Sequence, residues 1–276
     1  MRVISLLTDF GLEDPYVGIM KGVILSRTPE VAIVDLSHQV DPQDLTAAAF
    51  LIDGAYTWFP MRTVHVIVVD PGVGGSRAIV AMAAAGHFFL APDNGVLTRI
   101  LDREKVEELV YVENPDFFIH PVSRTFHGRD IFAPVAAHMA RGRALSDFGP
   151  KALPVNLQRL DLPVPYVSDS VAGPVLVGTV IAVDRFGNLV TNLEEDRLHS
   201  FVPDMEAAGL SIQIGDHAVH GLASSYQAVA PGEALAIIGS RGYLEISVNR
   251  GDASRRCGAA KGSEVRVSRF RPPGSF

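Results

Sequence analysis

The run VHVIVVDPGVGGSR (residues 64–77) decides the fold of the first half of the chain. Val64–Val69 is apolar and mostly β-branched, which is typical of a strand that is covered on both faces. Two shorter apolar runs precede it, at Val3–Leu7 and Val31–Val34, and Tyr16–Ser26 between them repeats its apolar residues at a helical period. Strands that alternate with helices predict an α/β domain with a mostly parallel sheet and helices on both faces.

Two further helices are expected in this half. Asp41-Pro42 has the composition of a helix start, with aspartate as N-cap and proline in the first turn, and Thr46–Phe59 continues the helix. Ile131–Ala140 forms the second one.

The second half has a different character. Five prolines lie between Pro150 and Pro174 without a helical period, which is typical of a linker. Short strand-like runs follow, punctuated by Gly, Asn and Asp, and they predict a small antiparallel barrel or sandwich. These runs are Val175–Val183, Leu210–Ile214, Ala234–Ile238, Tyr243–Val248 and Glu264–Val267. We expect an α/β domain over 1–168 and an all-β domain over 169–276.

Composition excludes several classes of protein. Hydrophobic residues make up 47% of the 276 residues, which excludes a disordered or collagen-like chain. The net charge of −7 argues against a nucleic-acid or anionic-membrane binder, since both need a basic face. No uncharged apolar stretch reaches the roughly 18 residues of a membrane span. A single cysteine, Cys257, cannot form an internal disulfide, so we expect a cytoplasmic protein.

Acidic residues follow the predicted strands at the edge where parallel α/β sheets bind ligands. They are Asp9, Asp35 and Asp70. Such a set suits a cation or a ligand with vicinal hydroxyls and repels phosphates. The alternative is that each aspartate only caps the following helix.

The turn after Asp70 could bring this carboxylate to Arg77, either in a site or as a structural ion pair. It matches neither a phosphate-binding loop nor a nucleophile elbow. Gly128 removes a side chain beside His127, which would allow close approach of a ligand. A lone histidine is more often structural, and no metal-ligand spacing occurs, so we expect no metal.

Two segments of the second half remain open between function and ordinary turns. Asp184–Asn192 reads as a turn between strands, where Asp and Asn are common for local reasons. Ser240 and Arg241 lie between two glycines, where they could clamp a carboxylate or form an ordinary hairpin.

The motifs together resemble the S-adenosyl-L-methionine (SAM) hydroxide adenosyltransferases, also called SAM hydrolases, which are related to SAM-dependent fluorinating and chlorinating enzymes. The matching segments run through nearly the whole chain in family order. They are TDFG at 8–11, Asp14, DLSH at 35–38, DPGVGGSR at 70–77, APDNGVLT at 91–98, TFHGRD at 125–130, DRFGNLVTN at 184–192 and GSRGYLEI at 239–246.

The resemblance implies an N-terminal α/β domain, a C-terminal β-barrel, and a homotrimer in which SAM lies between the first domain of one subunit and the second domain of the next. It also implies roles for twelve residues. Asp70, Arg77 and His127 match the set associated with the attacking water. The ligand contacts are Asp9 on the ribose hydroxyls, Asp14 and Asp184 on the methionine side, Ser240 and Arg241 on the methionine carboxylate, and Asn188, Tyr226 and the backbone around Asn249 and Arg250 near adenine.

Departures from the halogenating branch favour water as the nucleophile. The fluorinating enzymes have a tyrosine where Asp70 stands, a serine where Gly128 stands, and a pocket tryptophan that matches Gln43. They also carry an extra loop after the third strand, whereas here Arg77 runs straight into the next strand.

The expected reaction is hydrolysis of SAM, as substrate and not as cofactor, to adenosine and L-methionine by attack of water at C5′. Asp70 or His127 would accept the proton, and the sequence leaves the choice open. The alternatives are a chloride-dependent SAM halide transferase and a non-catalytic SAM or adenosine sensor. A methyltransferase is disfavoured because no glycine-rich loop follows the first strand.

Overall fold

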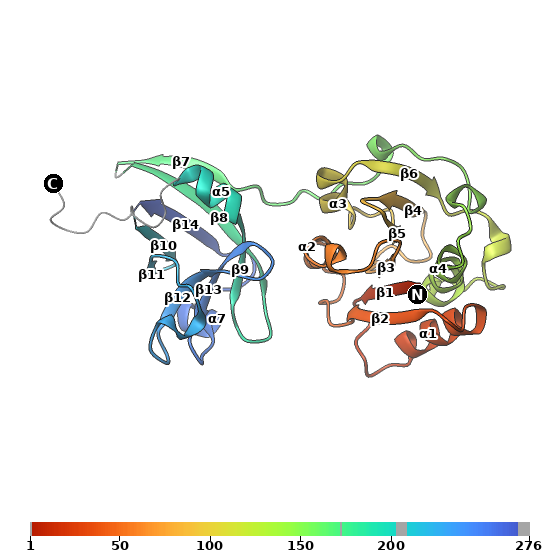
Figure 1. Cartoon of the computed structure of the whole chain (residues 1–276), viewed down its shortest axis with the longest axis horizontal. Coiled ribbons are helices and arrows are strands. Elements are labelled where there is room, and N and C mark those ends of the chain that lie inside the picture. Colours follow the sequence, from red (N-terminus) through yellow and green to blue (C-terminus); the bar gives the residue numbers. More distant parts are fainter. Residues whose placement is uncertain (1, 172, 203–208, 270–276) are drawn as a thin grey trace. The chain divides into compact units, whose positions relative to one another are not determined.

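The computed structural model describes residues 2–171, 173–202 and 209–269 (Figure 1). The chain forms two compact units, Met1–Asp161 and Leu162–Phe276. The boundary expected after residue 168 lies inside a strand of the second unit, β7 (Tyr166–Ser170).

The first unit is built on a six-stranded mixed sheet. In spatial order the strands are β2 (Ala32–Ser37), β1 (Val3–Thr8), β3 (Val64–Val68), β5 (His87–Pro92), β4 (Ile79–Ala84) and β6 (Val106–Tyr111). The first four of these are parallel, whereas β4 runs antiparallel to both β5 and β6. The sheet is therefore mixed, and β4 is the strand that departs from the expected mostly parallel arrangement.

The reversal at β4 has a local cause. Only Ala85 and Gly86 separate β4 from β5, and both have positive φ, 51° and 73°. A two-residue turn of this kind forces the strands it joins to be antiparallel, because a parallel connection needs a dozen residues or more.

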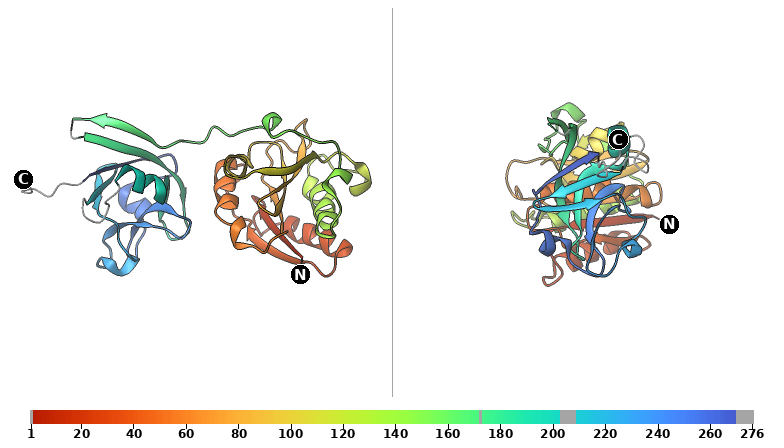
Figure 2. Two further views of the ribbon diagram at one scale, coloured as in Figure 1. Left: turned by 45° about the horizontal axis from the view of Figure 1, so that its top comes forward. Right: turned by 90° about the vertical axis from the view of Figure 1, so that its left-hand side faces the viewer.

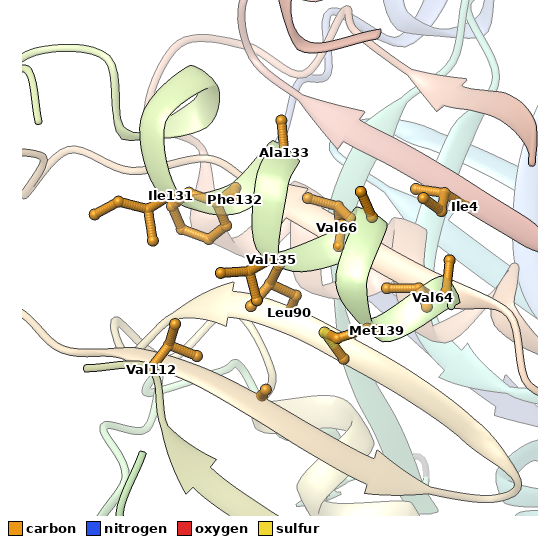
Figure 3. Packing of buried hydrophobic residues seen from close by; sticks show 14 of the residues in the cluster. Ile4, Val64, Val66, Leu90, Val112, Ile131, Phe132, Ala133, Val135 and Met139 are labelled. Atoms are coloured by element: carbon orange, nitrogen blue, oxygen red, sulfur yellow. The ribbon is translucent and has the colours of Figure 1, made fainter. Parts of the chain in front are cut away.

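Helices cover both faces of this sheet, as the alternation of elements predicted. α1 (Tyr16–Arg27) and α4 (Ala133–Ala140) pack on one face with the side chains of Val64 and Val66. Figure 3 shows Val135 and Met139 of α4 beside these valines. On the other face, α2 (Leu45–Asp53) and α3 (Thr98–Arg103) pack against the alternate side chains of the same strands.

The start of α2 differs from the expectation at Asp41-Pro42. The N-cap is Asp44, whose side chain accepts a hydrogen bond from the Ala47 N–H at 2.9 Å. Gln43 has a φ of 68°, which no helix can contain, so the chain turns once more before the helix begins. The helix ends at Asp53 and is followed by a separate 3₁₀ turn, Tyr56–Trp58.

The second unit is a nearly closed, barrel-like antiparallel sheet. Its strand order is β11 (His217–His220), β10 (Leu210–Ile214), β14 (Glu264–Arg269), β8 (Gly173–Val183), β9 (Leu189–Glu194), β13 (Tyr243–Val248) and β12 (Ala234–Ile238). β7 pairs with β8, and the two form a long hairpin (Figure 2). In the described part of this unit, the short helices α5 (Glu195–Phe201) and α7 (Ala253–Cys257) pack around one apolar core.

All five strands expected in this unit are present, and β7, β9 and β11 are additional. The sequence pattern did not predict β9 as a strand, because β9 carries buried polar residues. Thr191 donates a hydrogen bond to the Leu244 carbonyl at 2.8 Å, and Asn192 donates one to the Pro163 carbonyl at 2.7 Å. These polar residues made the whole segment resemble a turn.

No helix in the described part of the chain is long and apolar enough to cross a membrane.

A buried histidine pair lies within the first unit. The Ser5 hydroxyl is 2.7 Å from Nδ1 of His65, whose Nε2 lies 3.3 Å from Nδ1 of His87. His65 is fully buried and stacks on Phe89. Burial, followed by the neighbouring His87, lowers the pKa of His65 to about 3.

We expect this burial to make the first unit sensitive to acid. The unfolded chain, with a histidine pKa near 6.5, binds a proton that the folded chain excludes until about pH 3. The free energy of unfolding should therefore fall by about 2 kcal/mol as the pH drops from 6.5 to 4.5. Urea unfolding followed by the fluorescence of Trp58, the only tryptophan, measures it. His65→Phe should lose this dependence, whereas a change of the exposed His199 to Gln should retain it. Equal slopes in wild type and His65→Phe would contradict the assignment.

Candidate functional site

Asp70 and Arg77 form a buried ion pair at the carboxyl end of β3. Arg77 donates from Nε to Oδ1 at 3.0 Å and to Oδ2 at 2.9 Å, and from Nη2 to Oδ2 at 2.5 Å. Only 4% of the Asp70 side chain and 11% of the Arg77 side chain are exposed. Ion pairs on the surface contribute little to stability, but a buried, bidentate ion pair fixes both groups in one geometry.

His127 is the third member of this cluster. Its Nδ1 lies 2.7 Å from Nη2 of Arg77. A guanidinium group can only donate, so Nδ1 accepts this hydrogen bond and the neutral ring carries its proton on Nε2. Burial, followed by the charge of Arg77, lowers the pKa of His127, while Asp70 and Asp130 act in the opposite direction. The sequence-predicted set of Asp70, Arg77 and His127 is thus brought together.

Local backbone features hold the two loops that carry this cluster. Gly74 has a φ of 75°, and a Cβ there would overlap the Arg124 carbonyl oxygen, so the loop after β3 packs directly on the segment before His127. A π-helical turn, Gly128–Phe132, follows His127 and leads into α4. Single π-turns inside helices are frequent at functional sites.

The buried Asp130 side chain stabilises the segment that carries His127. Its Oδ2 accepts a hydrogen bond from the Ser123 N–H at 2.8 Å, and Arg129 donates to Oδ1 at 2.6 Å. The Asp130 side chain is fully buried. Burial raises its pKa, but the hydrogen bonds from Arg129 and Ser123 outweigh burial and hold the pKa below its usual value.

The aspartates expected at strand ends do not cap helices, and Asp35 lies inside β2 (Ala32–Ser37) rather than after it. Asp9 accepts a hydrogen bond on Oδ2 from the Gln43 N–H at 2.9 Å, while Asp35 lies 2.6 Å from Nζ of Lys21 and 3.0 Å from Nε2 of His38. The N-cap of α1 is Pro15, without a side-chain hydrogen bond. Each aspartate therefore has its own partner.

An aromatic cluster joins the segment after β1 to the segment that carries His127. Phe10, Tyr16 and Phe126 contact one another with ring centroids 5.0 to 6.1 Å apart. Asp9 and His127 therefore lie on neighbouring segments. Asp14, the other ligand residue expected in this unit, is exposed just before α1.

The second unit contains a cavity of about 1020 Å³. Six of the seven ligand residues that the sequence predicted in this unit line it: Asp184, Asn188, Tyr226, Ser240, Arg241 and Arg250. The seventh, Asn249, is buried beside it and donates from Nδ2 to the Val229 carbonyl at 2.7 Å, while its backbone N–H and C=O bond to Glu233 and Gly232.

Asp184 also has the turn role that the sequence left open. Its Oδ1 accepts hydrogen bonds from the backbone N–H groups of Phe186 at 2.8 Å and Asn188 at 2.9 Å, and the Asn188 side chain donates to Oδ2 at 2.8 Å. The carboxylate therefore shapes the cavity wall that it lines.

Sequence reasoning assigned no role to Glu245, which lines the same cavity with 6% of its surface exposed. Its Oε2 accepts a hydrogen bond from the Tyr226 hydroxyl at 3.3 Å. Burial raises the pKa of Glu245, and Asp184 acts in the same direction, against Arg241 and Tyr226. The available signal was a carboxylate inside YLEISV, a strand whose six residues are all buried.

Among residues 2–171, 173–202 and 209–269, no group of three or more His, Cys, Asp or Glu side chains is arranged to hold a metal ion.

Comparison with known proteins places both units in one family. A family model described as the SAM hydroxide adenosyltransferase N-terminal domain matches residues 4–149, and its C-terminal counterpart matches residues 178–266. The chain belongs to the SAM hydroxide adenosyltransferase family.

Relatives of this SAM hydroxide adenosyltransferase chain extend over its whole length. An (R)-S-adenosyl-L-methionine hydrolase from Thermus thermophilus is 38% identical, with 97% of this chain and 100% of the relative covered. One of the same name from Salinispora tropica is 37% identical over 96% and 97% of the two chains. A fluorinase from an Actinoplanes species is 28% identical over 90% and 91%.

Two solved structures also match nearly the full chain. An uncharacterized conserved protein from Thermotoga maritima has a TM-score of 0.89 and 37% identity, covering 96% of this chain and 100% of that one. A conserved hypothetical protein from Thermus thermophilus has a TM-score of 0.75 and 35% identity, covering 97% and 100%.

The geometry of His127 gives a direct test. We expect His127 to titrate below the usual histidine value of about 6.5 and to carry its neutral-state proton on Nε2. Arg77→Met should raise the pKa of His127, because the ring loses a cationic neighbour and keeps the anionic Asp70. NMR titration of ¹⁵N-labelled histidines, with His127→Gln used to assign the signal, measures both properties. A neutral ring protonated on Nδ1 would refute the proposed hydrogen bond from Arg77.

Proposed function

We propose that the chain hydrolyses SAM to adenosine and L-methionine. The observation that carries this is the buried Asp70–Arg77–His127 cluster at the carboxyl end of β3, in a chain whose full-length relatives at 35–38% identity are named (R)-S-adenosyl-L-methionine hydrolases. The names of these relatives specify the (R) form of SAM. The substrate therefore has to be defined by its configuration at the sulfonium sulfur as well as by its identity.

The reaction is an in-line displacement at C5′ of the ribose. The water oxygen forms a bond to C5′, the C5′–S bond breaks, and its electron pair neutralises the sulfonium to give the methionine thioether. One proton leaves the attacking water. The neutral leaving group needs no acid, so the site has to align water, C5′ and sulfur and accept that proton.

We assign the proton to Asp70 rather than His127. The Nδ1 lone pair of His127 is used by Arg77, and its other nitrogen carries hydrogen. Oδ2 of Asp70 accepts two hydrogen bonds from Arg77, whereas Oδ1 accepts one and keeps a second lone pair for the proton. Arg77 orients Asp70, and His127 accepts a hydrogen bond from the same Nη2 that donates to Asp70.

The remaining predicted contacts divide the substrate between the two units. Asp9 receives the ribose hydroxyls and Asp14 lies on the methionine side. In the second unit, Asp184 pairs with the methionine ammonium, Ser240 and Arg241 hold its carboxylate, and adenine meets Asn188, Tyr226 and the backbone at 249–250. The lining of one cavity by six of these residues supports the second group.

We further propose that the protein works as a homotrimer in the cytoplasm. The resemblance implies that the second unit of a neighbouring subunit completes each site. The division of the ligand residues between two separate units supports such sharing. The single cysteine supports a reducing compartment.

The decisive experiment is product identification. Resolved (R)- and (S)-SAM are incubated with the protein, with and without chloride or fluoride, and the products are separated by chromatography. Adenosine and methionine in equal amounts, unaffected by halide, are expected. A 5′-halo-5′-deoxyadenosine product would identify a halide transferase, and tight binding without turnover would identify a sensor.

Replacing the proton acceptor should slow the chemistry more than it weakens binding. Asp70→Asn keeps the size of the side chain and should lower kcat by about 10²–10⁴-fold. The Kd for SAM should change only a few-fold, as calorimetry would show. His127→Gln should lower kcat less than Asp70→Asn does. The opposite order would identify His127 as the acceptor.

Subunit sharing predicts complementation between inactive variants. Asp70→Ala and Arg241→Ala each damage one half of the site, so after subunit exchange about a quarter of the interfaces would combine two intact halves. Turnover of the mixture at low SAM concentration should rise well above that of either variant. A wild type that is active as a monomer, by light scattering, would contradict the trimer.

A further inference from the structure

Glu245 presents a buried carboxylate that none of the proposed substrate contacts uses. It lies on β13, is 6% exposed and lines the cavity of the second unit. A Cβ at Gly239 would overlap the Glu245 carboxylate, so this carboxylate lies directly against the backbone just before Ser240. Gly239 therefore makes room for Glu245 beside the proposed carboxylate clamp.

Within the described residues, Glu245 forms no ion pair. Among these residues its hydrogen-bond partner is the neutral Tyr226 hydroxyl at 3.3 Å, and Arg241 acts on it only through its charge. A buried carboxylate without a paired cation is unfavourable unless a ligand supplies the positive charge. Three acidic residues (Asp184, Glu245 and Asp252) and two arginines (Arg241 and Arg250) line the cavity, and Asp252 already pairs with Arg255.

One charged group of the substrate lacks a partner among the proposed contacts. SAM carries an ammonium, a carboxylate and a sulfonium. The proposed function, on which this step rests, pairs the ammonium with Asp184 and the carboxylate with Ser240 and Arg241. The sulfonium has no partner among those contacts.

We propose that Glu245 is the specificity-determining residue that makes the cavity prefer a sulfonium ligand to the corresponding uncharged thioether. The attraction acts through charge and needs no hydrogen bond, which a sulfonium could not donate. The Tyr226 hydroxyl holds the carboxylate in place.

This role has a kinetic consequence. The sulfonium loses its charge as the C5′–S bond breaks, so the attraction to Glu245 is stronger in the ground state than in the transition state. Removing the charge should raise KM without lowering kcat, which distinguishes Glu245 from Asp70. The attraction also vanishes once methionine, a thioether, has formed.

The test compares SAM with S-adenosyl-L-homocysteine, the same molecule without the methyl group and its charge. Calorimetry is performed in the Asp70→Asn background, so that SAM is not consumed. Glu245→Gln keeps the shape of the side chain and an acceptor for Tyr226, and it should weaken SAM about ten-fold while changing the thioether less than three-fold. Glu264→Gln, which removes an exposed carboxylate of the same unit, should leave both affinities unchanged.

Two results would overturn the inference. Equal loss of SAM and thioether affinity in Glu245→Gln would mean that Glu245 only shapes the cavity, and so would a fall in kcat with constant KM in the Asp70-containing protein. Thermal melting of Glu245→Gln checks that it folds. If wild type hydrolyses SAM and the ratio of the two affinities is unchanged in Glu245→Gln, the inference alone fails. If wild type neither binds nor hydrolyses SAM, the proposed function fails with it.

Discussion

The first unit's part of the candidate site is held together by the hydrogen bonds of the Arg77 guanidinium group. Arg77 is the only side chain among the described residues that hydrogen-bonds to both Asp70 and His127, and His127 lies 50 residues from Arg77 in sequence. Because the pair with Asp70 is buried, removing either partner would leave an uncompensated charge, at a cost of about 3–5 kcal/mol. The close packing of Gly74 on the Arg124 carbonyl and the anchoring of Ser123 by Asp130 become useful only because Arg77 links the two loops.

The two units handle charge in different ways. In the first unit the buried carboxylates of Asp70 and Asp130 each pair with an arginine of the same unit, so their charges are compensated before any ligand arrives. In the second unit, Glu245 lines a cavity without an ion pair among the described residues. The first arrangement fixes the geometry of the paired groups, whereas the second leaves electrostatic attraction available to a ligand.

Much of this could be predicted from the sequence where one local signal dominates. The bounds of β12 and β13 were predicted residue for residue, because apolar runs between glycines or turn residues admit few alternatives. The antiparallel β4, the late start of α2 and the polar strand β9 were missed. Each depends on a contact between distant residues or on a backbone conformation. The positive φ of Gln43 is an example, because a residue other than glycine gives no sign of it in the sequence. Glu245 was missed for a related reason, because its burial and its neighbours become visible only once the barrel is folded.

The hydrogen bond between Asp9 and Gln43 constrains the backbone at position 43 but not the side chain there. Asp9 is held by the backbone N–H of Gln43, while the side chain of Gln43 is exposed. Any residue that tolerates the left-handed conformation can supply that N–H, so natural selection can replace the side chain without disturbing the carboxylate. The resemblance aligns this position with the pocket tryptophan of the fluorinating branch. A single codon change here can therefore replace an exposed side chain while the Asp9 carboxylate keeps its backbone hydrogen bond, which makes position 43 a point where the family can vary at little structural cost.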